Sequence, residues 1–204
     1  DEVVVIAQSV GAVLVATWVH DYAPAIRGLV LASPAFKVKL YVPLARPALA
    51  LWHRLRGLFF INSYVKGRYL THDRQRVASF NNDPLITRAI AVNILLDLYK
   101  TSERIISDAA AITLPTQLLI SGDDYVVHRQ PQIDFYQRLR SPLKELHLLP
   151  GFYHDTLGEE NRAQAFEKMQ SFICRLYANK SQKFDYQYED RTGPSADRWR
   201  LLSG

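Results

Sequence analysis

Polar side chains that follow three apolar runs carry the chemistry that this sequence predicts. Ala7-Gln8-Ser9-Val10-Gly11 has the small-x-Ser-x-Gly form of a sharp strand-to-helix turn that exposes a serine hydroxyl. Farther along the chain, Asp123 and Asp124 follow one apolar run, and His154 follows the next. Serine, carboxylate and histidine together activate a hydroxyl for attack on a carbonyl carbon. The sequence therefore predicts a nucleophilic site built on Ser9.

The turn at Ser9 has a second interpretation. Ala7 stands where this motif usually has glycine, which keeps the position small but narrows the allowed backbone angles. A serine at the start of a helix also caps it, by accepting a hydrogen bond from the second or third backbone amide. The pentapeptide alone leaves both roles open, and the two later loops favour the nucleophile.

Apolar runs alternating with helical patterns predict an α/β fold with a mostly parallel sheet. The four predicted strands are Glu2–Gln8, Gly28–Ser33, Thr116–Ser121 and Lys144–Leu149, the first of them a central strand. Helical spacing of apolar residues covers Val10–Tyr22, Arg129–Leu139 and Asn161–Asn179. Because the carboxyl ends of parallel strands meet at one edge, we expect the residues that follow these strands to converge there.

The order serine, acid, histidine along the chain is that of an α/β-hydrolase. In that arrangement His154 removes the proton of Ser9, and a carboxylate orients the imidazole and stabilises its charged form. Residues 1–34 and 115–179 are then the core. Residues 35–114 form a helical lid that returns to the core, and residues 180–204 form a polar tail or linker.

Several further motifs make the sequence resemble a known family from about Val3 to Leu176. It is similar to the serine hydrolases that include serine aminopeptidases, monoacylglycerol lipases and lysophospholipases. Besides the turn at Ser9, the resemblance rests on Ser33-Pro34, Leu70-Thr71-His72-Asp73, Asn82-Asp83-Pro84-Leu85, Asp124-Tyr125-Val126-Val127 and Gly151-Phe152-Tyr153-His154. It implies that Asp124, rather than Asp123, is the acid and that His154 is the histidine.

The resemblance implies a serine hydrolase that cleaves lipid-type carboxylic esters, of a monoacylglycerol or lysophospholipid, through an acyl-serine intermediate. The backbone amide of Val10 is the expected oxyanion donor. A second donor ordinarily comes from an earlier loop, and because only eight residues precede Ser9, we expect it to be absent from this chain. The alternative is a non-catalytic binding or scaffold domain with an incomplete hydrolase fold. Epoxide and haloalkane hydrolases are disfavoured because they use a carboxylate where this chain has Ser9.

Positive charge is concentrated in the predicted lid. Residues 35–76 contain nine lysines and arginines but one acidic residue, and basic residues alternate with large apolar ones from Leu40 to Ile61. This pattern predicts an amphipathic helix. The helix either lies against an anionic membrane, or its apolar face covers the active site while its basic face is in water. No nucleic-acid-binding motif accompanies the charge, so we expect a lipid-like ester substrate and no nucleic acid.

The remaining expectations concern cofactors, location and assembly. No zinc-ligand spacing, paired cysteines, Walker loop or Gly-x-Gly-x-x-Gly motif occurs, so we predict neither a metal nor a cofactor. The sequence shows no signal peptide or membrane-spanning run, which predicts a cytoplasmic protein with peripheral membrane contact at most. With no strand before Val3–Ile6, that apolar strand edge is expected to be exposed or covered, for example in a homodimer.

Overall fold

Four parallel strands form the central sheet of the protein. The structure is a computed structural model that describes residues 3–42 and 44–178. The strands are β1 (Val4–Gln8), β2 (Gly28–Ala32), β5 (Thr116–Ser121) and β6 (Lys144–Leu149), in the spatial order β1-β2-β5-β6. Their bounds agree with the sequence prediction to within two residues.

Alternation of side chains divides the core into two layers, one on each face of the sheet. Leu29 and Leu31 of β2 pack into one cluster, whereas Val30 and Ala32 pack into the other. All residues of β2 and β5 are buried, as expected for inner strands covered on both faces.

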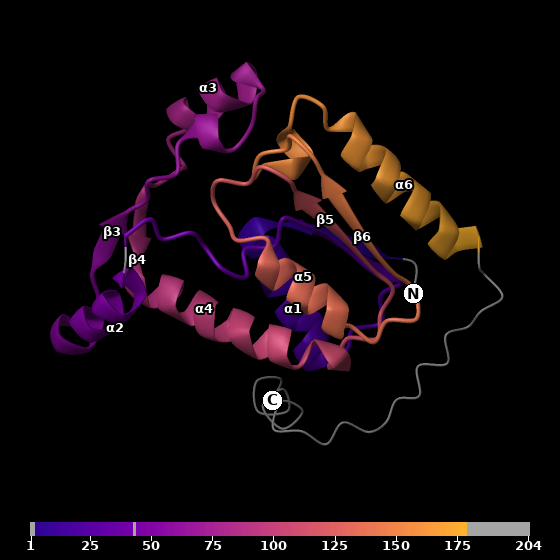
Figure 1. Ribbon diagram of the computed structural model, residues 1–204, viewed down its shortest axis with the longest axis horizontal. Helices are drawn as coiled ribbons and strands as arrows, with labels where there is room; N and C mark the ends of the chain where they lie inside the picture. Colours follow the sequence, from indigo (N-terminus) through magenta and orange to yellow (C-terminus); the bar gives the residue numbers. More distant parts are fainter. Residues whose placement is uncertain (1–2, 43, 179–204) are drawn as a thin grey trace, which may run out of the picture.

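Helices cover both faces of the sheet (Figure 1). On one face, α1 (Ser9–Tyr22), α4 (Val92–Ser107) and α5 (Gln130–Arg138) contribute to the larger core cluster. On the other face, α6 (Ala163–Ala178) packs through Met169, Phe172 and Leu176. The α/β-hydrolase architecture predicted from the sequence is thus confirmed. Asn179, the last residue of the predicted helix Asn161–Asn179, lies outside the described residues.

The segment between β2 and β5 contains both helices and a small sheet. Its elements are α2 (Ala45–Arg56), β3 (Phe60–Asn62), the 3-10 turn η1 (Gly67–Tyr69), α3 (Arg74–Asn82), β4 (Ala89–Ala91), α4 and the 3-10 turn η2 (Ala109–Ala111). Strands β3 and β4 pair antiparallel, an element that the sequence analysis missed. In Figure 1, α2, α3 and this small sheet lie beyond one end of the central sheet, whereas α4 returns beneath it.

Strand β1 lies at the edge of the sheet within the described residues, whereas the sequence predicted a central strand. It pairs with β2 alone, and Ile6 is 45% exposed. Leu14, Trp18 and Tyr22 on the adjoining helix α1 are exposed as well. The predicted tail at 180–204 lies outside the described residues, and no helix within 3–42 and 44–178 is long and apolar enough to cross a membrane.

A close backbone crossing follows β5. A side chain added at Gly122 would lie 2.7 Å from the carbonyl oxygen of Leu149 and 2.9 Å from Cα of Pro150, both of them backbone atoms that cannot rotate away. Gly122 also donates its backbone N–H to Leu149 at 2.8 Å. Glycine at this position therefore lets the loops after β5 and β6 lie together.

We predict that Gly122→Ala lowers the free energy of unfolding by about 1–3 kcal/mol, because overpacking displaces backbone. The matched control is Gly11→Ala on α1, where an added Cβ meets nothing within 4 Å among the described residues. That control should be neutral or stabilising by up to about 1 kcal/mol, since alanine has the higher helix propensity. Denaturant unfolding of both variants measures the difference, and equal effects would contradict the crossing.

Candidate active site

The turn between β1 and α1 holds Ser9 in an uncommon backbone conformation. Its φ is +56°, in the left-handed region that residues other than glycine rarely adopt. The carbonyl oxygen of Ser9 accepts a hydrogen bond from the backbone N–H of Ala35 at 3.0 Å, which ties the turn to the end of β2. Strain of this kind persists only where surrounding contacts enforce it, and it is common at functional sites.

The Ser9 hydroxyl contacts a histidine from the far end of the chain. Ser9 Oγ lies 2.7 Å from Nε2 of His154, although 145 positions separate the two residues. His154 is buried, with 5% of its surface exposed. A serine that caps a helix would bond to helix amides, whereas the Ser9 hydroxyl bonds to His154. The contact therefore favours the nucleophile over the cap.

Asp124 lies on the other side of the His154 ring. Its Oδ2 is 2.7 Å from Nδ1 of His154, while its Oδ1 accepts backbone N–H bonds from Val126 at 2.7 Å and Val127 at 2.9 Å. With Nδ1–H donated to the carboxylate, Nε2 is the unprotonated nitrogen that accepts from a serine hydroxyl. The structure thus brings together Ser9, His154 and Asp124, the three side chains named from the sequence.

The other candidate acid and histidines lie elsewhere. Asp123 is exposed, and His128, the other histidine in an edge loop, is exposed too. Partial burial, together with the charges of Lys37 and Lys39, lowers the pKa of His128. The remaining histidines bond to other groups: His20 to Asp21 and Asp108, His53 to the Gly57 carbonyl, His72 to Glu159, and His147 to Glu145.

Val10 is the second residue of α1, which begins at Ser9. The first four backbone N–H groups of a helix have no partner within the helix, so the Val10 amide belongs to the set that can serve an external acceptor. It directly follows the serine, which is the position of one of the two oxyanion donors in this type of site. Within 3–42 and 44–178, no three His, Cys, Asp or Glu side chains are grouped to hold a metal ion.

Buried hydroxyl groups hold the loop that follows His154 against the sheet. Thr156 begins the 3-10 turn η3 (Thr156–Gly158), and its Oγ1 lies 2.8 Å from Oγ of Ser33 and 2.9 Å from Oγ of Ser121. Ser33 Oγ also accepts the backbone N–H of Ser121 at 3.2 Å. These contacts join the ends of β2 and β5 to the histidine loop, and the sequence analysis did not identify Thr156.

A buried carboxylate links the same loop to the segment before α3. Glu159, 2% exposed, accepts backbone N–H bonds from Tyr153 at 2.9 Å and His72 at 3.0 Å, and its Oε1 lies 2.9 Å from Nδ1 of His72. Burial alone would raise the pKa of Glu159, but the amides of Tyr153, His72 and Glu160 and the His72 side chain together lower it below its ordinary value. Sequence analysis also missed this residue.

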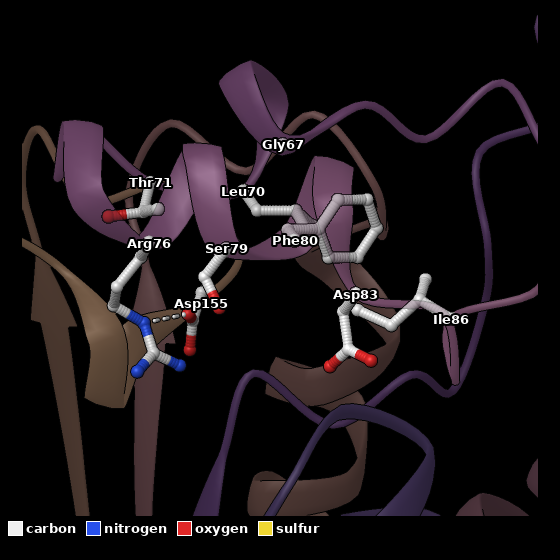
Figure 2. A pocket seen from close by; sticks show the side chains of 9 residues that line it. All are labelled: Gly67, Leu70, Thr71, Arg76, Ser79, Phe80, Asp83, Ile86 and Asp155. Atoms are coloured by element: carbon white, nitrogen blue, oxygen red, sulfur yellow. Dashed lines mark hydrogen bonds and ion pairs between the residues drawn. The ribbon is translucent and has the colours of Figure 1, made fainter.

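A cavity of about 200 Å³ lies beside the histidine loop, between that loop, η1 and α3 (Figure 2). Arg76 of α3 and Asp155, the residue after His154, face each other there, with Arg76 Nε 2.9 Å from Oδ2 of Asp155. The lining residues are Gly67, Leu70, Thr71, Arg76, Ser79, Phe80, Asp83, Ile86 and Asp155.

The sheet, the strained turn and the Ser9–His154–Asp124 grouping are those of an α/β-hydrolase. A model of the serine aminopeptidase S33 family matches residues 1–161, and the chain belongs to that hydrolase family.

Individual proteins and solved structures are similar to the chain as well. The Escherichia coli K12 protein YnbC is 96% identical over all 204 residues, which make up 35% of its own length, so the chain spans about a third of that relative. Phospholipase YtpA of Bacillus subtilis is 24% identical over 176 residues, which cover 83% of this chain and 67% of YtpA. Monoacylglycerol lipase of Paleococcus ferrophilus has the same fold, with a TM-score of 0.76 and 18% identity over 85% of this chain and 69% of that one.

We predict that the Glu159 carboxylate stabilises the fold in a pH-dependent manner. Because its pKa is lower in the folded state, its contribution is present above the unfolded-state pKa of about 4.3 and is lost as the pH falls through the folded value. In Glu159→Gln, the side-chain NH2 group faces N–H donors and leaves them without an acceptor. The free energy of unfolding should therefore fall by about 1–3 kcal/mol at pH 7. The cost should shrink below about pH 4.

Denaturant unfolding at pH 7 and at about pH 3 measures this effect, with Glu160→Gln as the matched control. Glu160 is the exposed neighbouring glutamate, so its variant should unfold as the parent does at both pH values. A Glu159→Gln cost that stays constant with pH would show that the charge of Glu159 contributes nothing.

Proposed function

We propose that this chain carries the catalytic residues of a serine carboxylic-ester hydrolase that acts on lipid-type esters such as monoacylglycerols or lysophospholipids. The observation that supports it most strongly is the pair of 2.7 Å contacts joining Ser9 to His154 and His154 to Asp124. A non-catalytic binding or scaffold domain has no need for that geometry, which is why we favour the enzyme.

The mechanism follows from the positions of the polar atoms. His154 Nε2 takes the proton as Ser9 Oγ attacks the ester carbonyl, and the Val10 amide donates to the oxygen that becomes negative. His154 then protonates the departing alcohol, which leaves an acyl group on Ser9. Water, activated by the same Nε2, releases the acid and restores the serine. Throughout, Asp124 holds the imidazole orientation and stabilises its positive charge.

Aromatic surface next to these residues supports an apolar substrate. Tyr125 directly follows Asp124, and Tyr153 directly precedes His154; their rings meet edge to face with centroids 5.0 Å apart. Tyr69 of η1 adds a third ring 5.8 Å from Tyr125. The names of the relatives, a phospholipase and a monoacylglycerol lipase, favour a lipid ester, whereas the family description favours a second candidate, cleavage of an amino-terminal peptide bond.

The neighbouring aspartates provide a matched test of the acid. We predict that Asp124→Asn in the intact protein lowers kcat on the order of 1,000- to 10,000-fold, because an amide there favours the wrong imidazole tautomer. Asp123→Asn, which alters an exposed side chain, should change kcat less than about threefold, as surface substitutions usually do.

The kcat assay compares three substrates: a long-acyl glycerol ester, an acetate ester and an aminoacyl arylamide. Faster turnover of the long-acyl ester supports the proposal, and faster turnover of the arylamide supports the peptidase. Equal losses in the two aspartate variants would contradict the role of Asp124.

We also propose that α2 contacts an anionic membrane from which the ester is drawn. No residue of α2 is buried, and Leu51, Trp52 and Leu55 are exposed, Leu55 at 72%. Arg56 lies over the Trp52 ring, 4.5 Å from its centroid, which sets a cation beside an apolar group as at a lipid interface. Arg46, in contrast, pairs with Glu103 of α4 and is left out of this surface.

The membrane contact predicts salt-dependent binding to anionic vesicles. Each basic residue near such a surface contributes about 1 kcal/mol, so Arg54→Gln with Arg56→Gln should weaken vesicle binding on the order of 10-fold at low salt. Arg138→Gln with Arg140→Gln removes equal charge from the region of α5 and should leave binding nearly unchanged. Vesicle co-sedimentation measures both pairs, and equal effects would contradict a specific role for α2.

A further inference from the structure

We propose that Gln8 and Asp155 are positioning residues that fix the distance between Ser9 and His154. Gln8 directly precedes Ser9, and Asp155 directly follows His154. The inference rests on the proposed function, because a fixed distance between serine and histidine matters only where the two exchange a proton.

The side-chain amide of Gln8 spans the gap between the two loops with both of its ends. Its Nε2 donates to Oδ1 of Asp155 at 2.8 Å, and its Oε1 accepts the backbone N–H of Leu157 at 2.9 Å. On the histidine loop, both contacts fall within the three residues that follow His154. Because one end must donate and the other must accept, neither a carboxylate nor an apolar side chain of the same length reproduces the pair.

The sheet itself does not supply this connection. Ser9 follows β1 and His154 follows β6, and the strand order β1-β2-β5-β6 sets two other strands between them. No backbone ladder therefore joins β1 directly to β6. Besides the Ser9–His154 contact itself, the bonds of Gln8 to Asp155 and Leu157 link the two loops directly, so the distance between hydroxyl and imidazole depends on them.

Asp155 is held from its other side as well. Its Oδ2 accepts from Arg76 Nε at 2.9 Å, a pair visible at the edge of the cavity in Figure 2, and its backbone N–H donates to the carbonyl of Leu70 at 2.8 Å. A Cβ added to Gly158 would come within 2.1 Å of both Arg76 Nε and Asp155 Oδ2. Gly158 thus leaves room for this ion pair, and both carboxylate oxygens of Asp155 are engaged.

Steady-state kinetics of the intact protein with a water-soluble ester, together with denaturant unfolding, test the proposal. Gln8→Met keeps the side-chain length without the amide and should lower kcat on the order of 10- to 100-fold with KM changed less than about twofold, as a displaced catalytic pair does. The acid-limb midpoint of the kcat/KM pH profile should stay in place, since no charge has changed.

A double-mutant cycle shows whether the two residues act as one unit. Asp155→Leu combined with Gln8→Met should lose less activity than the product of the two single losses, because the Gln8–Asp155 bond is already lost in each single variant. Asp155→Asn keeps an oxygen that accepts from Gln8 and should retain more activity than Asp155→Leu. Gln130→Met is the matched control, since Gln130 donates to Asp134 at the same 2.8 Å on the exposed face of α5, and its kcat should match the parent.

Two results would overturn the proposal: an unchanged kcat in Gln8→Met, whether or not its unfolding free energy falls, or losses that multiply in the double variant. If Gln8→Met fails to fold, the comparison of Asp155→Asn with Asp155→Leu decides instead, and equal activities contradict the proposal. A parent protein without Ser9-dependent turnover would refute the proposed function as a whole. An active parent with unaffected variants would refute only the positioning role.

Discussion

The parallel register of four strands is the constraint from which the site follows. Gln8 pairs with Ala32, Ala32 pairs with Leu119, and Ser121 pairs with Leu149, so the strands end close to one line across the sheet. Each group of the site lies a few residues past one of these ends. A shift of one strand by a single residue would turn its buried side chains to the opposite face and break the core on both sides.

Polar side chains buried at the carboxyl edge of the sheet need hydrogen-bond partners in place of water. Most of the contacts around the site provide such partners. Asp124 receives two backbone amides, and Thr156 joins two serine hydroxyls at the ends of β2 and β5. Glu159 receives donors from both the histidine loop and the segment before α3. An unpaired buried group costs about 1–3 kcal/mol, so such a network selects one arrangement of the loops. The orientation of His154 is therefore fixed by groups that never touch a substrate.

Local patterns predicted the strands of the central sheet. Strands β5 and β6 begin and end where the apolar runs at Thr116–Ser121 and Lys144–Leu149 do. Strands β3 and β4 have three residues each and no fully buried position, so no alternation or long apolar run marks them. A family resemblance selected Asp124 over Asp123 as the acid. The physical reason is visible only in the fold, where the backbone amides of Val126 and Val127 donate to Asp124. Gln8 and Asp155 carry no local pattern, since their contact spans 147 positions.

The most direct test of the account is covalent labelling of the intact protein with a fluorophosphonate, followed by peptide mapping. Ser9 is the sole serine among residues 1–27, so fragment ions that place the adduct within these residues of the tryptic peptide ending at Arg27 locate the nucleophile. The account predicts an adduct on Ser9 in the parent and none in a His154→Ala variant, because Ser9 needs His154 to lose its proton. An unlabelled Ser9 with an adduct on another residue, or equal labelling of Ser9 without His154, would contradict it.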